Sequence, residues 1–188
     1  MRGRVFTASE ATTAGVSRQA VYDVWHRGQL ARAGRGLFAF NGLDLGPHQT
    51  LAEAATQVPN GIVCLLSALA FHGLTMQNPH EVWMAIPEKA WKPRVDTLPI
   101  HFVRFSGAAY HEGVEEHWVS RVVVRVYGPA KTVADCFKYR NKIGLDVALE
   151  ALQDYWRQRR GSLDELIRYA RICRVANVMR PYLEAVTQ

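Results

Sequence analysis

The chain has 188 residues, of which 48% are apolar, and it carries a formal net charge of +6. This composition excludes an intrinsically disordered chain, and the length suffices for two modest domains with cores of their own. No apolar run reaches the roughly 18 residues of a membrane span, and no apolar stretch follows the first residues as in a secretory signal, so we expect a cytoplasmic protein.

Two short helices separated by a glycine turn are predicted in the first 28 residues. Thr7 and Glu10 have the spacing of a capping box and begin a helix that ends near Ala14. Gly15 provides the turn, and Ser17 caps a second helix that ends at Gly28. The second helix has one apolar stripe, made of Ala20, Val21, Val24 and Trp25.

A basic β-hairpin is predicted directly after the second helix. Residues 29–32 and 37–40 flank Gly34-x-Gly36, a pattern that favours two short strands around a turn. Arg32 and Arg35 lie in this hairpin. Two helices followed by a basic hairpin predict a winged helix-turn-helix DNA-binding domain over residues 1–42.

The polar face of the second helix has the side chains that a helix needs in the major groove. Arg18 can pair with O6 and N7 of guanine, and Gln19 with N6 and N7 of adenine. Arg32 and Arg35 are better placed for phosphate or the minor groove, whereas Asp23 would repel phosphate and is expected to point away. The predicted DNA-binding residues of this domain are Ser17, Arg18, Gln19, Tyr22, His26, Arg32 and Arg35. The alternative is a helix pair in a core that binds nothing, with a solvated basic face.

Residues 41–47 are polar, rich in turn formers and without periodicity, so we place a linker there and a second domain over residues 47–188. Helices are predicted over residues 48–57 and 66–73, and strands over 82–86, 100–105 and 118–127. Further helices are predicted over 131–140, 145–159 and 162–174, followed by a last helix that contains Pro181. The fold class is therefore α+β, with a small sheet and a helical C-terminal half.

The basic residues are concentrated at both ends of the chain. Residues 1–40 and 131–188 each carry a net charge of +4, whereas residues 41–130 carry −2. Arg168, Arg171 and Arg174 recur every three residues near the C-terminus and are candidates to bind DNA beside the site that the first domain reads. The alternative is a solvated helix face, which we favour for residues 157–160.

The sequence gives little support for catalysis, and we expect no catalytic, metal or cofactor site. The histidines lack the paired spacing of metal ligands, and His72 is expected to be a hydrogen-bonded core or helix-end residue. Glu81, Glu88 and Lys89 flank a predicted strand and loosely resemble a metal-dependent nuclease, but their order is wrong for such a site. Lys131 and Asp135 have the spacing of a salt bridge, or of a buried polar anchor between the two domains. The three cysteines, Cys64, Cys136 and Cys173, are predicted to be buried thiols.

Several motifs resemble the AbiEi family, the antitoxins and autorepressors of type IV toxin–antitoxin systems. They are Phe6-Thr7-Ala8-Ser9-Glu10-Ala11, Gly15-Val16-Ser17, Gly28-Gln29-Leu30 and Arg35-Gly36-Leu37-Phe38 in the first domain. In the second they are Ser67-Ala68-Leu69-Ala70-Phe71-His72-Gly73-Leu74, Val82-Trp83-Met84-Ala85-Ile86-Pro87 and Lys131-Thr132-Val133-Ala134-Asp135-Cys136-Phe137. The resemblance implies a repressor that binds double-stranded operator DNA. It also implies a genetically paired nucleotidyltransferase toxin with which the antitoxin forms no stable complex.

One departure from the family pattern concerns the first helix of the winged domain. Only five residues precede Phe6, too few for a helix that covers the apolar stripe. We therefore expect Val21, Val24 and Trp25 to pack against the second domain or a second copy of the chain. Two other functions stay open: a nucleic-acid-processing enzyme targeted by the winged domain, and a protein-interaction module that binds no DNA.

Overall fold

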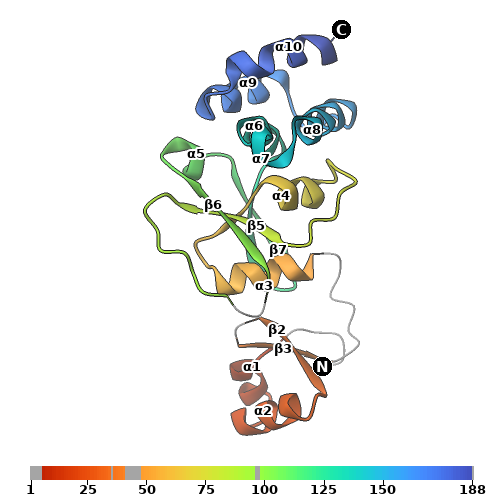
Figure 1. Cartoon of the computed structure of the whole chain (residues 1–188). Helices are drawn as coiled ribbons and strands as arrows, with labels where there is room; N and C mark the ends of the chain where they lie inside the picture. The colour runs from red at the N-terminus through yellow and green to blue at the C-terminus, as the bar shows by residue number, and fades with distance from the viewer. Residues whose placement is uncertain (1–5, 35, 41–47, 96–97, 188) are drawn as a thin grey trace. The chain divides into compact units, whose positions relative to one another are not determined.

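The computed structural model describes residues 6–34, 36–40, 48–95 and 98–187 (Figure 1). It confirms a mixed α+β fold with small sheets and a helical C-terminal half. The chain divides into two compact units. The first unit comprises residues 1–59 and 117–124, and the second unit comprises residues 60–116 and 125–188.

The first unit begins with a three-stranded sheet and two helices. Its strands are β1 (Phe6–Thr7), β2 (Leu30–Gly34) and β3 (Leu37–Phe40), in the order β1-β3-β2, with β3 antiparallel to both neighbours. Helices α1 (Ala8–Thr13) and α2 (Arg18–His26) lie between β1 and β2 in the chain. The predicted helix pair and hairpin are therefore present.

The caps of α1 and α2 form as the sequence predicts. The Thr7 hydroxyl accepts from the Glu10 N–H at 3.1 Å, and the Glu10 carboxylate accepts from the Thr7 N–H at 2.8 Å. The Ser17 hydroxyl caps α2 by accepting from the Ala20 N–H at 3.2 Å. Between the helices, Gly15 has φ +86°, a conformation that is strained for residues with a Cβ.

The apolar stripe of α2 is covered within the first unit, so its expected packing against the second domain or a second copy is wrong. Val21 is 3% exposed and belongs to a small core with Ala8, Ala11, Leu30 and Phe38. Val24, Trp25 and Phe6 pack against the same core and are partly buried. The physical reason is that Phe6 forms a strand beside β3, which places it and Phe38 over the stripe.

Two further segments belong to the first unit. Helix α3 (Gln49–Gln57) packs against β2, and in Figure 1 the β2–β3 hairpin lies between α3 and the α1–α2 pair. The tip of a later hairpin, residues 117–124, contributes Arg121, whose guanidinium lies 2.7 Å from the Glu10 carboxylate. The first unit is thus larger than residues 1–42, while the predicted linker at 41–47 lies outside the described residues.

The second unit is built around a five-stranded sheet. Its strands are β4 (Ile62–Val63), β5 (Val82–Pro87), β6 (Ile100–Phe105), β7 (Val114–Val119) and β8 (Val122–Tyr127), in the order β6-β5-β4-β8-β7. Strands β5 and β6 are parallel, as are β4 and β8, whereas β4 and β5 are antiparallel. Helix α4 (Leu65–His72) ends at Gly73, as predicted, and the short α5 (Ala108–His111) follows β6.

The prediction of one strand over residues 118–127 is wrong. A two-residue turn at Ser120 and Arg121 divides this stretch into β7 and β8. Both turn residues have positive φ, +49° and +68°, which is the geometry of a tight hairpin turn. Neither residue is the Asn, Asp or Gly that usually adopts positive φ in such a turn, and apolar residues continue on both sides, so the run resembles a single strand.

Five helices form the C-terminal half: α6 (Pro129–Lys138), α7 (Arg140–Ile143), α8 (Leu145–Arg157), α9 (Leu163–Ile172) and α10 (Ala176–Val186). Helix α6 is central because it contacts α4, α8 and α9. Pro129 begins it at the position where proline is tolerated, and the predicted capping box of Ser162 and Glu165 begins α9. Pro181 lies inside α10. No helix among the described residues is long and apolar enough to cross a membrane.

Candidate nucleic-acid interface

The first turns of α2 form an exposed polar surface. The exposed residues are Ser17, Arg18, Gln19, Tyr22 and His26. Arg18 forms no ion pair with any residue that the structure describes. This guanidinium is therefore available to a ligand. The structure brings these five predicted residues together on one short helix.

Gln19 and Asp23 interact with each other, which corrects the expectation that Asp23 points away. The Gln19 amide donates to the Asp23 carboxylate at 3.1 Å, and both side chains are exposed. Residues four apart lie on the same helix face, so the Asp23 carboxylate lies on the same face as the Gln19 side chain. The Gln19 amide nitrogen carries two N–H donors, so one can donate to a base while the other donates to Asp23.

Tyr22 has a structural role beside its exposed edge. Its ring makes edge contacts with Phe38 at 5.5 Å and with Trp25 at 6.2 Å between centroids, and the side chain is 38% exposed. The tyrosine therefore links α2 to β3 while it stays partly exposed. His26 lies on the last turn of α2, against Trp25, and is farther along the helix from the residues that begin it.

Of the two hairpin arginines, only Arg32 is among the described residues. Arg32 lies in β2, where its backbone pairs with Phe38 of β3. Arg35 is outside the described residues, so its predicted phosphate contact stays a prediction. The β2–β3 hairpin itself is present and irregular, since its register shifts between Arg32 and Gly34.

The three C-terminal arginines have different surroundings. Arg168 forms an ion pair with Glu112 at 2.6 Å, and this hydrogen bond raises the pKa of Arg168. Arg171 lines a groove between α9 and α10, and Arg174 lies in the turn between these helices with φ +60°. The structure therefore does not show the three arginines as one free DNA-binding face. Arg171 and Arg174 are nevertheless exposed.

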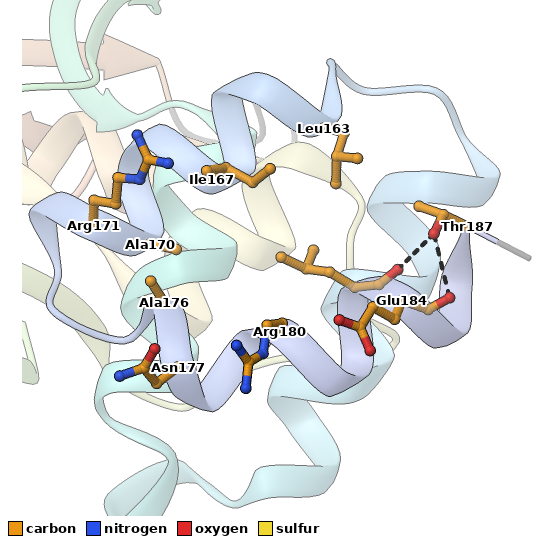
Figure 2. A pocket seen from close by; sticks show the side chains of 10 residues that line it. Leu163, Ile167, Ala170, Arg171, Ala176, Asn177, Arg180, Glu184 and Thr187 are labelled. Atoms are coloured by element: carbon orange, nitrogen blue, oxygen red, sulfur yellow. Dashed lines mark hydrogen bonds between the residues drawn. The ribbon is translucent and has the colours of Figure 1, made fainter.

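The groove beside Arg171 has a volume of about 310 Å³ (Figure 2). Leu163, Ile167 and Ala170 line it from α9, and Arg180 and Glu184 from α10. Figure 2 shows Arg171 and Arg180 on opposite helices, at the edges of this apolar floor. The lining of the groove thus combines apolar side chains with charged ones.

The residues considered for nuclease chemistry do not converge. Glu81 and Glu88 flank opposite ends of β5, which separates them by more than about 20 Å at the usual rise per residue. Glu81 instead lies 3.8 Å from His101. Among the described residues, no group of three His, Cys, Asp or Glu side chains could hold a metal ion. His72 is a hydrogen-bonded core residue, as predicted, with Nε2 2.8 Å from the Tyr127 carbonyl oxygen.

Lys131 and Asp135 form a buried ion pair, but it does not lie between the domains as considered from the sequence, because both residues and their contacts belong to the second unit. Both side chains are 0% exposed, and Nζ lies 2.5 Å from the carboxylate. Lys131 Nζ also lies 4.1 Å from the centre of the Tyr127 ring, and the Cys173 thiol donates to Asp135 at 3.1 Å. Burial raises the pKa of Asp135, and the interactions with Lys131 and Cys173 partly offset this increase.

All three cysteines are buried free thiols, as predicted. Burial is the main cause that raises the pKa of each of them.

Reasoning from the sequence missed two ion pairs, Arg168 with Glu112 and Arg121 with Glu10. Nothing in the spacing of Glu112 and Arg168, or of Glu10 and Arg121, indicates that they meet, because each pair is joined by the fold and not by one element. The pairing of Gln19 with Asp23 was accessible, since four-residue spacing on a helix predicts it.

Comparison with known proteins relates the start of the chain to a regulatory family. No curated protein matches the chain. A family model does match, and it covers the β1-to-β3 segment whose α2 surface is described above. Residues 1–41 match the family described as transcriptional regulator, AbiEi antitoxin.

Proposed function

We propose that the protein is a sequence-specific DNA-binding transcriptional autorepressor and the antitoxin of a type IV toxin–antitoxin system. The observation that carries this proposal is the exposed start of α2, where Arg18 has no partner among the described residues. The family match over the same segment supports a regulatory role. Helices α1 and α2 followed by the β2–β3 hairpin have the order of a winged helix-turn-helix.

In this proposal the start of α2 enters the major groove of the operator. Arg18 pairs with guanine and Gln19 with adenine, while Ser17, Tyr22 and His26 line the contact. Arg32 and Arg35 bind phosphate or the minor groove from the hairpin. Arg171 and Arg174 are secondary candidates for flanking phosphates, and Arg168 would first have to leave Glu112.

The antitoxin part of the proposal depends on the family and not on any geometry of the second unit. The expected toxin is a nucleotidyltransferase encoded beside this protein. As the family implies, the antitoxin counteracts this toxin without forming a stable complex with it. The protein acts in the cytoplasm on its own operon.

The proposal is tested by fluorescence anisotropy with duplexes that tile the DNA upstream of the gene. Binding of one duplex should exceed that of the others and should weaken steeply with salt. Arg18→Ala should reduce the preference for that duplex by about 5- to 150-fold, which corresponds to the roughly 1–3 kcal/mol of one bidentate base contact. Arg159→Ala, which removes an exposed arginine from the second unit, is the matched control.

Asp23→Asn provides a second test with the opposite sign. Removing a negative charge beside the groove should strengthen binding to all duplexes, more at low salt than at high salt. If Arg18→Ala and Asp23→Asn both bind every duplex as the wild type does, α2 does not enter the groove and the proposal is wrong.

A further inference from the structure

Strand β6 is an edge strand of the five-stranded sheet, and the loop that precedes it is held against it. This loop follows β5 and extends away from the sheet before it returns to β6 (Figure 1). The Ala90 N–H donates to the Pro87 carbonyl at 3.0 Å. From β6, the Arg104 guanidinium donates to the carbonyls of Glu88 and Ala90 at 3.1 and 3.4 Å. The start of the loop is therefore fixed on the edge strand.

Trp91, on this loop, is 95% exposed. An indole ring has a large apolar surface that is usually buried in a core or an interface. The loop around Trp91 is tied down by Arg104, yet the ring itself points into solvent. Such a side chain is a candidate to stack on a flat partner.

Cations lie close to Trp91 in the sequence, and others lie on or beside β6. Lys89, Lys92 and Arg94 are exposed on the loop, and Lys92 Nζ lies 5.6 Å from the centre of the Phe102 ring on β6. Further along, the Tyr139 hydroxyl donates to the Arg104 carbonyl at 3.1 Å, and Lys142 Nζ lies 5.7 Å from the Tyr139 ring. We call the set formed by Lys89, Trp91, Lys92, Arg94, Arg104 and Lys142 the β6-edge surface.

The cations of the β6-edge surface have no carboxylate partner among the described residues, in contrast to three of the other surface arginines. Arg121, Arg157 and Arg168 each lie within 2.7 Å of an Asp or Glu. No ion pair involves the β6-edge surface within the described residues, although Glu88 lies at the start of the same loop and is exposed. The neighbouring Asp96 is outside those residues.

We infer that the β6-edge surface binds single-stranded nucleic acid, with a base stacked on Trp91 and phosphates bound by the cations around it. Proteins that bind unpaired strands combine a cationic track with exposed aromatic rings, because every base has a face that can stack and every nucleotide carries a charge. In a duplex the base faces are covered by their neighbours, so Trp91 would have nothing to stack on. This inference goes beyond the proposed operator binding and uses no residue of α2.

The test measures anisotropy of the full-length protein with labelled oligo(dT) and oligo(U) of about 20 nucleotides, and with a duplex of the same length. Both single strands should bind, with affinity that falls as salt rises. Trp91→Ala should weaken single-strand binding by about 5- to 150-fold, the range for loss of one base–aromatic stack, while Trp91→Phe should retain most of it. Lys92→Gln should reduce the slope of log affinity against log salt by about 0.7.

Trp118→Ala is the matched control, because Trp118 is 76% exposed and lies in the other unit. The exposed position of Trp91 means that its removal should leave the melting temperature unchanged, which circular dichroism checks. Arg18→Ala should weaken operator binding but leave single-strand binding intact, so the two proposals can fail separately.

Four outcomes would overturn the inference. They are no single-strand binding by the wild type, equal effects of Trp91→Ala and Trp118→Ala, and an equal loss of duplex binding in Trp91→Ala. The fourth is binding to vesicles of phosphatidylcholine and phosphatidylglycerol that needs Trp91 while oligonucleotide binding does not; it would assign the surface to a membrane.

Discussion

Lys131 and Asp135 show how a single pair of residues constrains the core of the second unit. Neither side chain reaches solvent, and their neighbours include the Tyr127 ring and the Cys173 thiol. Taking two charges out of water is costly, and the attraction between them offsets that cost only while both are present. The stability of the core should therefore depend on the pair and not on either residue alone.

This argument predicts a specific pattern of stabilities. Asp135→Leu leaves a buried lysine without a partner and should lower the free energy of unfolding by about 3–5 kcal/mol. The double variant Lys131→Met with Asp135→Leu removes both charges and should recover most of this loss. Urea unfolding followed by circular dichroism measures both. A double variant that is no more stable than the single one would contradict the argument.

At the scale of residues, local pairs could be predicted from the sequence, but pairs made by the fold could not. Thr7 and Glu10 cap α1, and Ser17 caps α2, because these interactions span three residues and need only a helix start. The ion pair of Arg168 with Glu112 joins residues 56 positions apart. No periodicity encodes such a contact, so the arginine was assigned to DNA without knowledge of its carboxylate.

At the scale of elements, α1 depends on Glu10 for both its cap and its tie to Arg121. The backbone hydrogen bond from Thr7 is the largest cause that lowers the pKa of Glu10 below its usual 4.5, and Arg121 adds to it. A lowered pKa means that the folded state favours the carboxylate. Its contribution to stability is therefore complete above about 4.5 and is lost as the pH falls through the lowered value.

We predict that the stability difference between the wild type and Glu10→Gln depends on pH. It should be constant above pH 4.5 and should shrink as the pH falls below that value, because the wild-type carboxyl becomes neutral there as well. Thermal unfolding between about pH 3 and 7 measures the difference. A difference that grows towards low pH would show that Glu10 acts in another way.

Long helices were the most predictable elements and short strands the least. The starts of α6 and α9 follow from Pro129 and Ser162, and the end of α4 from Gly73. Strand β4 has two residues, too few to show alternation, and was missed. It is nevertheless the centre of the sheet, with β5 on one side and β8 on the other. This short strand therefore joins the two halves of the sheet, although its length gives no signal in the sequence.

At the scale of the whole molecule, the first unit is not continuous in the chain. It includes α3 and the hairpin tip at 117–124, which the predicted boundary near residue 42 assigned to the second domain. Polarity and turn residues indicate where a linker is plausible, but they do not show which side a later element packs on. Helix α3 packs against β2, and that contact exists only in the folded chain.

A fragment of residues 1–59 should therefore be less stable than the same residues in the full chain. It lacks the hairpin tip, including Arg121, that contacts Glu10. Amide hydrogen exchange of α1 and α2 should be faster in the fragment, and the wild-type chain under the same conditions is the control. Equal exchange in both would show that the tip contributes nothing to the first unit.

The buried thiols give the molecule a built-in chemical reporter. Cys173 is 1% exposed and Cys64 and Cys136 are 0% exposed, so an alkylating reagent reaches them only when the surrounding helices separate. The rate of alkylation would thus record how often the interior opens. A fluorophore could be attached through one introduced surface cysteine without first replacing the native three.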